Sequence, residues 1–183
     1  MLNIERKGSK WEEEDPIVVK KNQIIREGSD NFGSAGTYEV FRSGDLSAPN
    51  GMIFFSASFG EASNYGKSDG SSPNKDIDTY HIKINNPLVV TGSTDAEMLR
   101  NAWEKLHPGK PYPKGPITSK QWQKADKQNA KALLDSPYDA IIYLKPKGRH
   151  EIQIPKKKAD KQLNKVKTTK HSGKFYNYKD EWV

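Results

Sequence analysis

The chain has 183 residues, of which 33% are hydrophobic, and it carries a formal net charge of +7. This length fits one domain with polar extensions, and the low hydrophobic content predicts a modest core. The absence of cysteine excludes disulfides and thiolate metal sites, and the four histidines lack ligand spacing, so we expect no metal site. No apolar run approaches the roughly 18 residues of a membrane span, and the N-terminus lacks the apolar centre of a signal peptide. We therefore expect a cytoplasmic monomer with no membrane contact.

Residues 1–36 are predicted to be an N-terminal segment that precedes the core. Ile17, Val18, Ile24 and Ile25 fit one side of a short helix, although residues 17–19 could equally form a strand. The glycines and serines of 28–36 are typical of a loop. The folded core is therefore expected to begin at residue 37.

The first part of this core is predicted to contain short strands. Two of them cover residues 37–43 and 51–58, and residues 61–65 favour a short helix. The alternation in residues 78–84 indicates a half-buried strand, which Pro87 interrupts before it resumes.

A helical insertion is predicted at about residues 93–135. Thr94 with Glu97, and Thr118 with Gln121, have the spacing of capping boxes, which begin helices. Two helices are therefore expected in this insertion.

Strands at 139–144 and 150–154 are expected to complete the core, which then covers residues 37–155. The remaining residues, 156–183, contain nine basic and three acidic side chains and hold most of the net charge. Such a charge run is usually a solvated or disordered tail, although it would also attract a polyanion.

The first two predicted strands end in an arginine, a glycine and two serines. Arg42 and Gly44 end the first strand, and an arginine there needs a partner because an unpaired buried ion is costly. Ser56 and Ser58 are expected on one face of the second strand, because side chains alternate along a strand. This set suits a ligand that carries phosphate and ribose groups.

Arg42, the aromatic–aromatic–Ser–x–Ser run at 54–58 and Glu151 resemble the ADP-ribosyltransferases of the arginine–serine–glutamate type. That family includes bacterial toxins and domains of large phage polyvalent proteins. Further segments follow the family's order: Gly51–Ser56, Glu61–Gly66, Ile84–Val90 and Tyr138–Tyr143. The resemblance covers about residues 37–155. It implies an α+β fold, a split β-sandwich of two packed antiparallel sheets with an NAD cleft between them.

The resemblance also implies an activity. The chain would be a mono-ADP-ribosyltransferase, a glycosyltransferase that uses NAD as a substrate and modifies a macromolecular acceptor, as toxins and effectors do. Glu151 would stabilise an oxocarbenium-like transition state, Ser56 would bind the ribose or orient Glu151, and Arg42 would hold a phosphate or support the pocket. The expected NAD-binding residues are Arg42, Ser43, Gly44, Phe55, Ser56, Ser58 and Tyr65.

The acceptor is expected to be anionic. Arginine-modifying members of the family carry Glu or Gln two residues before the catalytic glutamate, where this chain has Arg149. An arginine there would repel a guanidinium acceptor, and Lys147 lies on the same turn. With the basic tail directly after the strand, the pattern favours nucleic acid or an acidic protein surface as the acceptor.

Each site residue also has a structural interpretation. Arg42 would then form an ion pair with Asp45 or Glu39, and Glu151 would be a solvated residue on an edge strand. The alternative function is a catalytically weak module of the same fold that binds nucleic acid or protein through its basic surface. Hydrolysis of NAD without transfer is a third interpretation.

Overall fold

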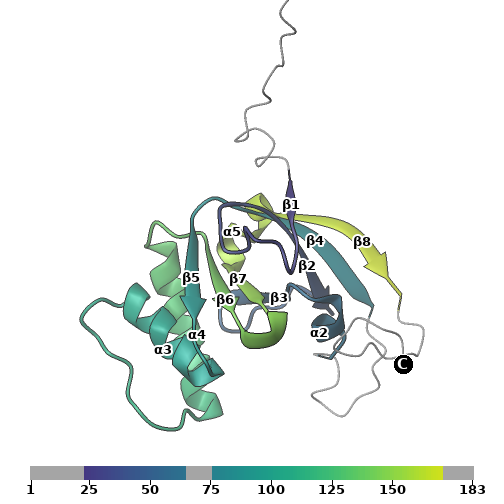
Figure 1. The fold of residues 1–183 in the computed structure, drawn as a ribbon. Helices are drawn as coiled ribbons and strands as arrows, with labels where there is room; N and C mark the ends of the chain where they lie inside the picture. The colour runs from purple at the N-terminus through teal and green to yellow at the C-terminus, as the bar shows by residue number, and fades with distance from the viewer. Residues whose placement is uncertain (1–22, 65–75, 171–183) are drawn as a thin grey trace, which may run out of the picture.

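Eight strands form one hydrogen-bonded sheet in the computed structural model, which describes residues 23–64 and 76–170 (Figure 1). The strands are β1 (Ile24–Ile25), β2 (Gly36–Ser43), β3 (Met52–Ser56), β4 (Ile77–Ile84), β5 (Pro87–Thr91), β6 (Ala140–Leu144), β7 (Glu151–Pro155) and β8 (Leu163–Thr169). The helices are α2 (Phe59–Asn64), α3 (Asp95–Leu106), α4 (Ser119–Leu134) and α5 (Lys156–Gln162), with a 3₁₀ turn, η2 (Pro146–Gly148). The predicted α+β class is confirmed.

The sheet consists of two halves that meet at one residue pair. The strand order is β5-β6-β7-β3-β2-β4-β8, and β1 pairs with β2. β2 pairs with β4 over its whole length, but it pairs with β3 only where Phe41 faces Ser56. The prediction of two separate antiparallel sheets is therefore wrong, because the halves are joined and the β1–β2 and β5–β6 pairs are parallel.

Helices α3 and α4 cover one face of the half that contains β5, β6, β7 and β3, as Figure 1 shows. The packed residues of this layer are Met52, Leu88, Val90, Met98, Ala102, Ala130, Leu133, Ile141 and Tyr143. A second cluster fills the opposite face and continues under β2 and β4. The predicted insertion is thus a layer of the fold that lies over the sheet.

The predicted starts of both insertion helices are confirmed. The Thr94 side chain accepts a hydrogen bond from the Glu97 backbone N–H. Thr118 and Gln121 exchange both bonds of a capping box. Each cap satisfies backbone donors that a helix start leaves without partners, which fixes where the helix begins.

Both predicted boundaries of the core need correction. Ile24–Ile25 form β1 and pair with β2, so the sheet begins before residue 37. Residues 156–169 form α5 and β8, and β8 pairs antiparallel with β4. The lysines of β8 suit an edge strand, because charged side chains there discourage pairing with another chain. Over the described part of the chain, no helix has the length and apolar character that crossing a membrane requires.

We predict that Ala159→Asp strongly destabilises the fold. Ala159 on α5 is 2% exposed and packs in the main core cluster, so the substitution buries a carboxylate without a partner. The free energy of unfolding in urea should fall by about 3 kcal/mol or more. The neighbouring Asp160 is exposed, and Asp160→Asn should leave the unfolding curve nearly unchanged. Equal curves for the two variants would show that α5 is not packed against the sheet.

Candidate functional site

A row of cross-strand neighbours forms the floor of the candidate site. Tyr143 on β6 faces Glu151 on β7, Glu151 faces Ser56 on β3, and Ser56 faces Phe41 on β2. Directly opposed residues of neighbouring strands project to the same face of a sheet. Tyr143 packs with α3 and α4, so the row lies on the face that these helices cover.

A cavity of about 510 Å³ lies over this row. Its helical wall comes from the insertion, through Asp95, Met98 and Leu99 of α3 and Trp122 and Asp126 of α4. Sites for small ligands typically have volumes of about 300–1,000 Å³ and mix apolar walls with a few polar groups. The cavity has this size and composition.

The three predicted catalytic residues, Arg42, Ser56 and Glu151, all line this cavity. Two of the predicted NAD-binding residues, Ser43 and Phe55, line it as well. The sheet register explains the proximity, since Ser56 faces Glu151 directly and Arg42 follows the residue that faces Ser56.

Other predicted NAD-binding residues have different positions. Ser58 is outside the wall of this cavity, and β3 ends at Ser56, so the prediction that both serines share a strand face is wrong. The Ser58 hydroxyl instead accepts from the Glu61 backbone N–H at 3.4 Å, at the start of α2. Gly44 also lies outside the wall, and its φ of 82° shows that the turn after β2 needs glycine. Tyr65 lies outside the described residues.

The guanidinium of Arg42 is held by backbone carbonyls. Its Nε donates to the Asp45 carbonyl at 2.6 Å, and its terminal nitrogens donate to the Phe54 carbonyl at 2.6 Å and the Ser47 carbonyl at 3.1 Å. At most two of its five N–H donors remain for a ligand. Burial lowers the pKa of the guanidinium, and the Asp45 charge partly offsets this. Glu39, the other acidic partner considered for it, pairs with Arg26 at 2.9 Å.

Both oxygens of the Glu151 carboxylate are engaged. Lys145 Nζ donates to Oε2 at 2.9 Å, and Gln153 Nε2 donates to Oε1 at 2.8 Å. The side chain is 12% exposed, and β7 lies between β6 and β3, so the interpretation as a solvated edge residue is wrong. Lys145 also lies 3.3 Å from Asp95, which places it between two carboxylates.

Asp126 is a carboxylate of the cavity that the sequence did not reveal. Its burial, together with the charge of Glu151, raises its pKa to about 6. Burial, which is the largest cause, and the charges of Glu151 and Asp126 raise the pKa of the Tyr143 phenol. With Asp95, three carboxylates line the cavity against the cations of Arg42 and Lys145. The carboxylates of the lining thus outnumber its cations, three to two.

A signal for Asp126 was present in the sequence. It follows Ala125 and lies four residues after Trp122, in the apolar stripe of the predicted helix. A carboxylate is seldom found on the buried side of a helix, so its position in this stripe is the signal. Lys145 gave no comparable signal, because nothing local indicates that it reaches Glu151.

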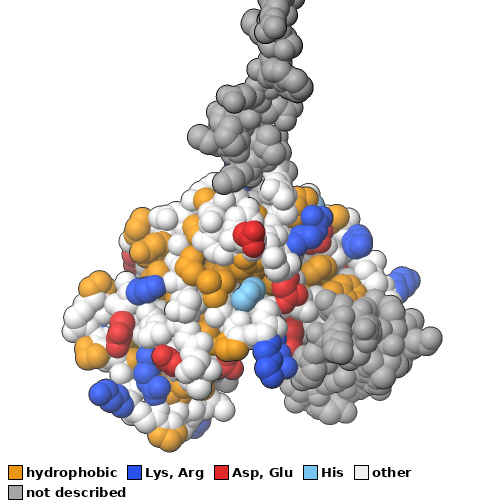
Figure 2. Space-filling view, viewed as in Figure 1, with side chains coloured by type: hydrophobic (Ala, Val, Ile, Leu, Met, Phe, Trp, Pro, Cys, Tyr) orange, Lys and Arg blue, Asp and Glu red, His pale blue; other side chains and the backbone are white. Residues whose placement is uncertain are grey.

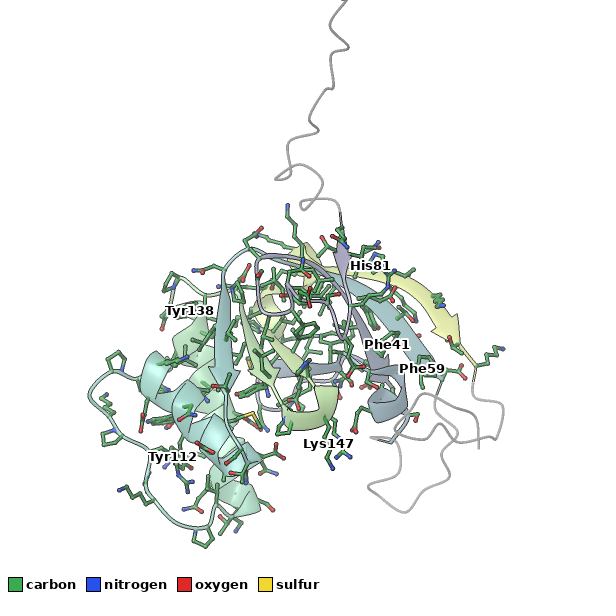
Figure 3. The ribbon with its side chains drawn as sticks, viewed as in Figure 1. Phe41, Phe59, His81, Tyr112, Tyr138 and Lys147 are labelled. Carbon is green, nitrogen blue, oxygen red and sulfur yellow. The ribbon has the colours of Figure 1, made fainter. Side chains whose placement is uncertain are left out.

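The residues expected to recognise the acceptor line a second cavity of about 460 Å³. It shares Ser56, Asp95, Met98 and Lys145 with the first, and adds Lys147 and Arg149 among others. Arg149 Nε lies 3.1 Å from a Glu61 carboxylate oxygen, which offsets part of its charge. Lys147 lies at the exposed tip of the turn between β6 and β7 (Figure 3).

Among the described C-terminal residues, the lysines of α5 lie away from Glu151. β7 runs from Glu151 to Pro155 and α5 begins at Lys156, so α5 begins about 16 Å from Glu151, at roughly 3.3 Å per residue. The expectation that this charge is tethered beside the site is wrong for the lysines of α5. On the face drawn in Figure 2, basic and acidic side chains are interspersed and form no single basic surface.

We predict that Glu151→Gln lowers the pKa of Asp126. The Glu151 charge is one of the two causes that raise this pKa, and its removal makes ionisation of Asp126 easier. Carboxyl ¹³C chemical shifts followed against pH would measure the change. Glu104→Gln, on the exposed side of α3, should leave the pKa of Asp126 where it is. An unchanged value in Glu151→Gln would show that the two carboxylates do not interact.

No metal site is indicated within residues 23–64 and 76–170, where no group of three or more His, Cys, Asp or Glu side chains is placed to hold an ion. No protein-family model, curated protein or solved structure matches this chain significantly. Inference about its function therefore rests on the residues of the two cavities.

Proposed function

We propose that the chain is a mono-ADP-ribosyltransferase that uses NAD as a substrate and modifies a macromolecular acceptor, as a toxin or effector of bacterial or phage type. One observation carries the proposal: Ser56 and Glu151 are opposed in the floor of one cavity, and Arg42 ends the adjoining strand. This is the constellation that the resemblance to the arginine–serine–glutamate transferases implies.

The reaction breaks the bond between the nicotinamide nitrogen and the ribose carbon. The electron pair of this bond leaves with nicotinamide, which becomes neutral, and the ribose carbon gains oxocarbenium character. The Glu151 carboxylate, held on both oxygens by Lys145 and Gln153, supplies a fixed negative charge beside that carbon. The nucleophilic atom of the acceptor then bonds to the carbon and loses a proton.

The charge of the cavity supports NAD as the ligand. The nicotinamide ring of NAD carries a positive charge, and the cavity offers carboxylates from Asp95, Asp126 and Glu151. Aromatic side chains of Phe41 and Trp122 line the same space and suit a flat cationic ring. We assign Arg42 a role in supporting the pocket. Its bonds to three carbonyls leave few N–H donors for a phosphate.

The alternative of a module that binds through a basic surface has less support. Arg149 is paired with Glu61, and Lys165 of β8 is paired with Asp78 at 2.8 Å. The lysines of β8 also have a structural role as protection of a sheet edge.

We predict that Glu151→Gln lowers the rate of nicotinamide release by about 100-fold or more, because it removes the charge beside the oxocarbenium centre. NAD affinity, measured by calorimetry, should change little, since the substitution hardly alters volume. Arg42→Ala should weaken NAD binding and also lower the stability of the fold, because three carbonyls lose their donor. Glu104→Gln is the matched control on the protein surface. Equal release by wild type and Glu151→Gln would remove Glu151 from the mechanism.

The proposed acceptor is anionic, because Arg149 and Lys147 line the second cavity. We predict that Arg149→Glu reduces labelling of a cell lysate by radiolabelled NAD more than it reduces NAD hydrolysis, and that added salt weakens labelling steeply. Lys157→Glu makes an equal change of charge at an exposed position of α5, beyond the far end of β7, and should have little effect on labelling. Labelling that is insensitive to both salt and Arg149→Glu would contradict an anionic acceptor.

A further inference from the structure

We propose that Asp126 on α4 is the general base of this site: it accepts the proton of the incoming nucleophile, which is water when no acceptor is bound. The inference rests on the proposed function, because it concerns the second half of the same reaction. The residue belongs to the helical insertion, outside the three residues that carry the resemblance.

Asp126 and Glu151 lie on opposite walls of one cavity. Glu151 belongs to the sheet floor, and Asp126 projects from a helix that lies over the same sheet face. A ribose bound between them would have Glu151 on one side and Asp126 on the other. Two carboxylates that flank a reacting sugar carbon can divide the work, one stabilising its charge and the other activating a nucleophile on the opposite face.

The surroundings of the two carboxylates assign these roles. Both oxygens of Glu151 already accept hydrogen bonds, Oε2 from the Lys145 ammonium and Oε1 from the Gln153 amide. Within the described residues, Asp126 has no hydrogen bond or ion pair, although an unpaired carboxylate in a partly apolar cavity is costly. A residue that destabilises the fold in this way is consistent with a role for Asp126 in function.

The protonation state of Asp126 suits a base near neutral pH. The groups that face it are Glu151 of β7, Tyr143 of β6, Asp95 of α3, Arg42 of β2 and Lys145. Of these, Glu151 acts with burial to raise its pKa to about 6. At pH 7 the carboxylate is therefore mostly ionised, and it still binds a proton more readily than an ordinary aspartate does.

With water as the nucleophile, the reaction conserves atoms and charge. The water oxygen bonds to the ribose carbon as the bond to nicotinamide breaks, and the electron pair of the broken bond leaves with nicotinamide. One water proton passes to the Asp126 carboxylate and then to solvent. The products are ADP-ribose, neutral nicotinamide and one proton.

The test measures NAD hydrolysis by the full chain and its Asp126→Asn variant, with and without sodium azide. Azide is an anionic nucleophile that needs no base. Asp126→Asn should lower hydrolysis about 100-fold, and azide should restore nicotinamide release with formation of ADP-ribosyl azide. Azide should not restore Glu151→Gln, because that variant lacks the charge that stabilises the reacting carbon. Asp160→Asn, on exposed α5, is the matched control and should behave as wild type.

The pH dependence gives a second readout. Wild-type hydrolysis should rise as the pH increases through about 6, because the base must lose its proton, and this limb should be absent in Asp126→Asn. Thermal unfolding at pH 8 checks the fold, and the variant should be at least as stable as wild type because it removes a buried charge.

Three results would overturn the inference. If Asp126→Asn hydrolyses NAD as wild type does, with the same pH limb, Asp126 is not the base and the proposed function stands. If hydrolysis falls and azide does not restore release, the role of Asp126 is structural. If wild type releases no nicotinamide from NAD, both the inference and the proposed function fail.

Discussion

The site depends on one guanidinium that fills the gap between two diverging strands. β2 and β3 pair where Phe41 faces Ser56, and beyond that point Arg42 reaches across and donates to the Phe54 carbonyl. A buried carbonyl left without a donor would cost about 1–3 kcal/mol. The side chain thus takes over bonds that a continuous ladder would have made. Arg42 supplies a donor to one β3 carbonyl where the two halves of the sheet diverge, and Arg42 and Phe54 both line the cavity.

The helical insertion adds a charged wall to this cavity. α3 and α4 bring carboxylates over a sheet floor that already contains Glu151. Lys145 bonds Glu151 and lies beside Asp95, whereas no cation within residues 23–64 and 76–170 is bonded to Asp126, whose pKa reflects burial and a neighbouring charge. The two carboxylates of one cavity therefore differ in their surroundings: Glu151 is bonded to a cation, and Asp126 has a raised pKa.

Local patterns in the sequence predicted most helices and strands, but they predicted few of the contacts between distant elements. Capping at Thr94 and Thr118 and the alternation of β4 depend on neighbouring residues, so the sequence displays them directly. The grouping of Arg42, Ser56 and Glu151 was predicted from the resemblance to a known family, because no local pattern shows that these distant residues line one cavity. β8 was missed because its residues are mostly exposed and lysine-rich, and its pairing with β4 depends on a distant edge that no local pattern shows. The contact of Lys145 with Glu151 depends on the η2 turn, which composition alone does not fix.

Lys145 stands in the wall that separates the two cavities and contributes to both. Its ammonium group has two carboxylates within reach, one on the sheet and one at the start of α3. A molecule that enters either cavity and shifts this ammonium toward one carboxylate changes the charge presented to the other cavity. Thermodynamic linkage then requires each occupant to alter the affinity of the other by the same factor. The occupants of the two cavities would then influence each other through a single side chain, with no movement of the sheet.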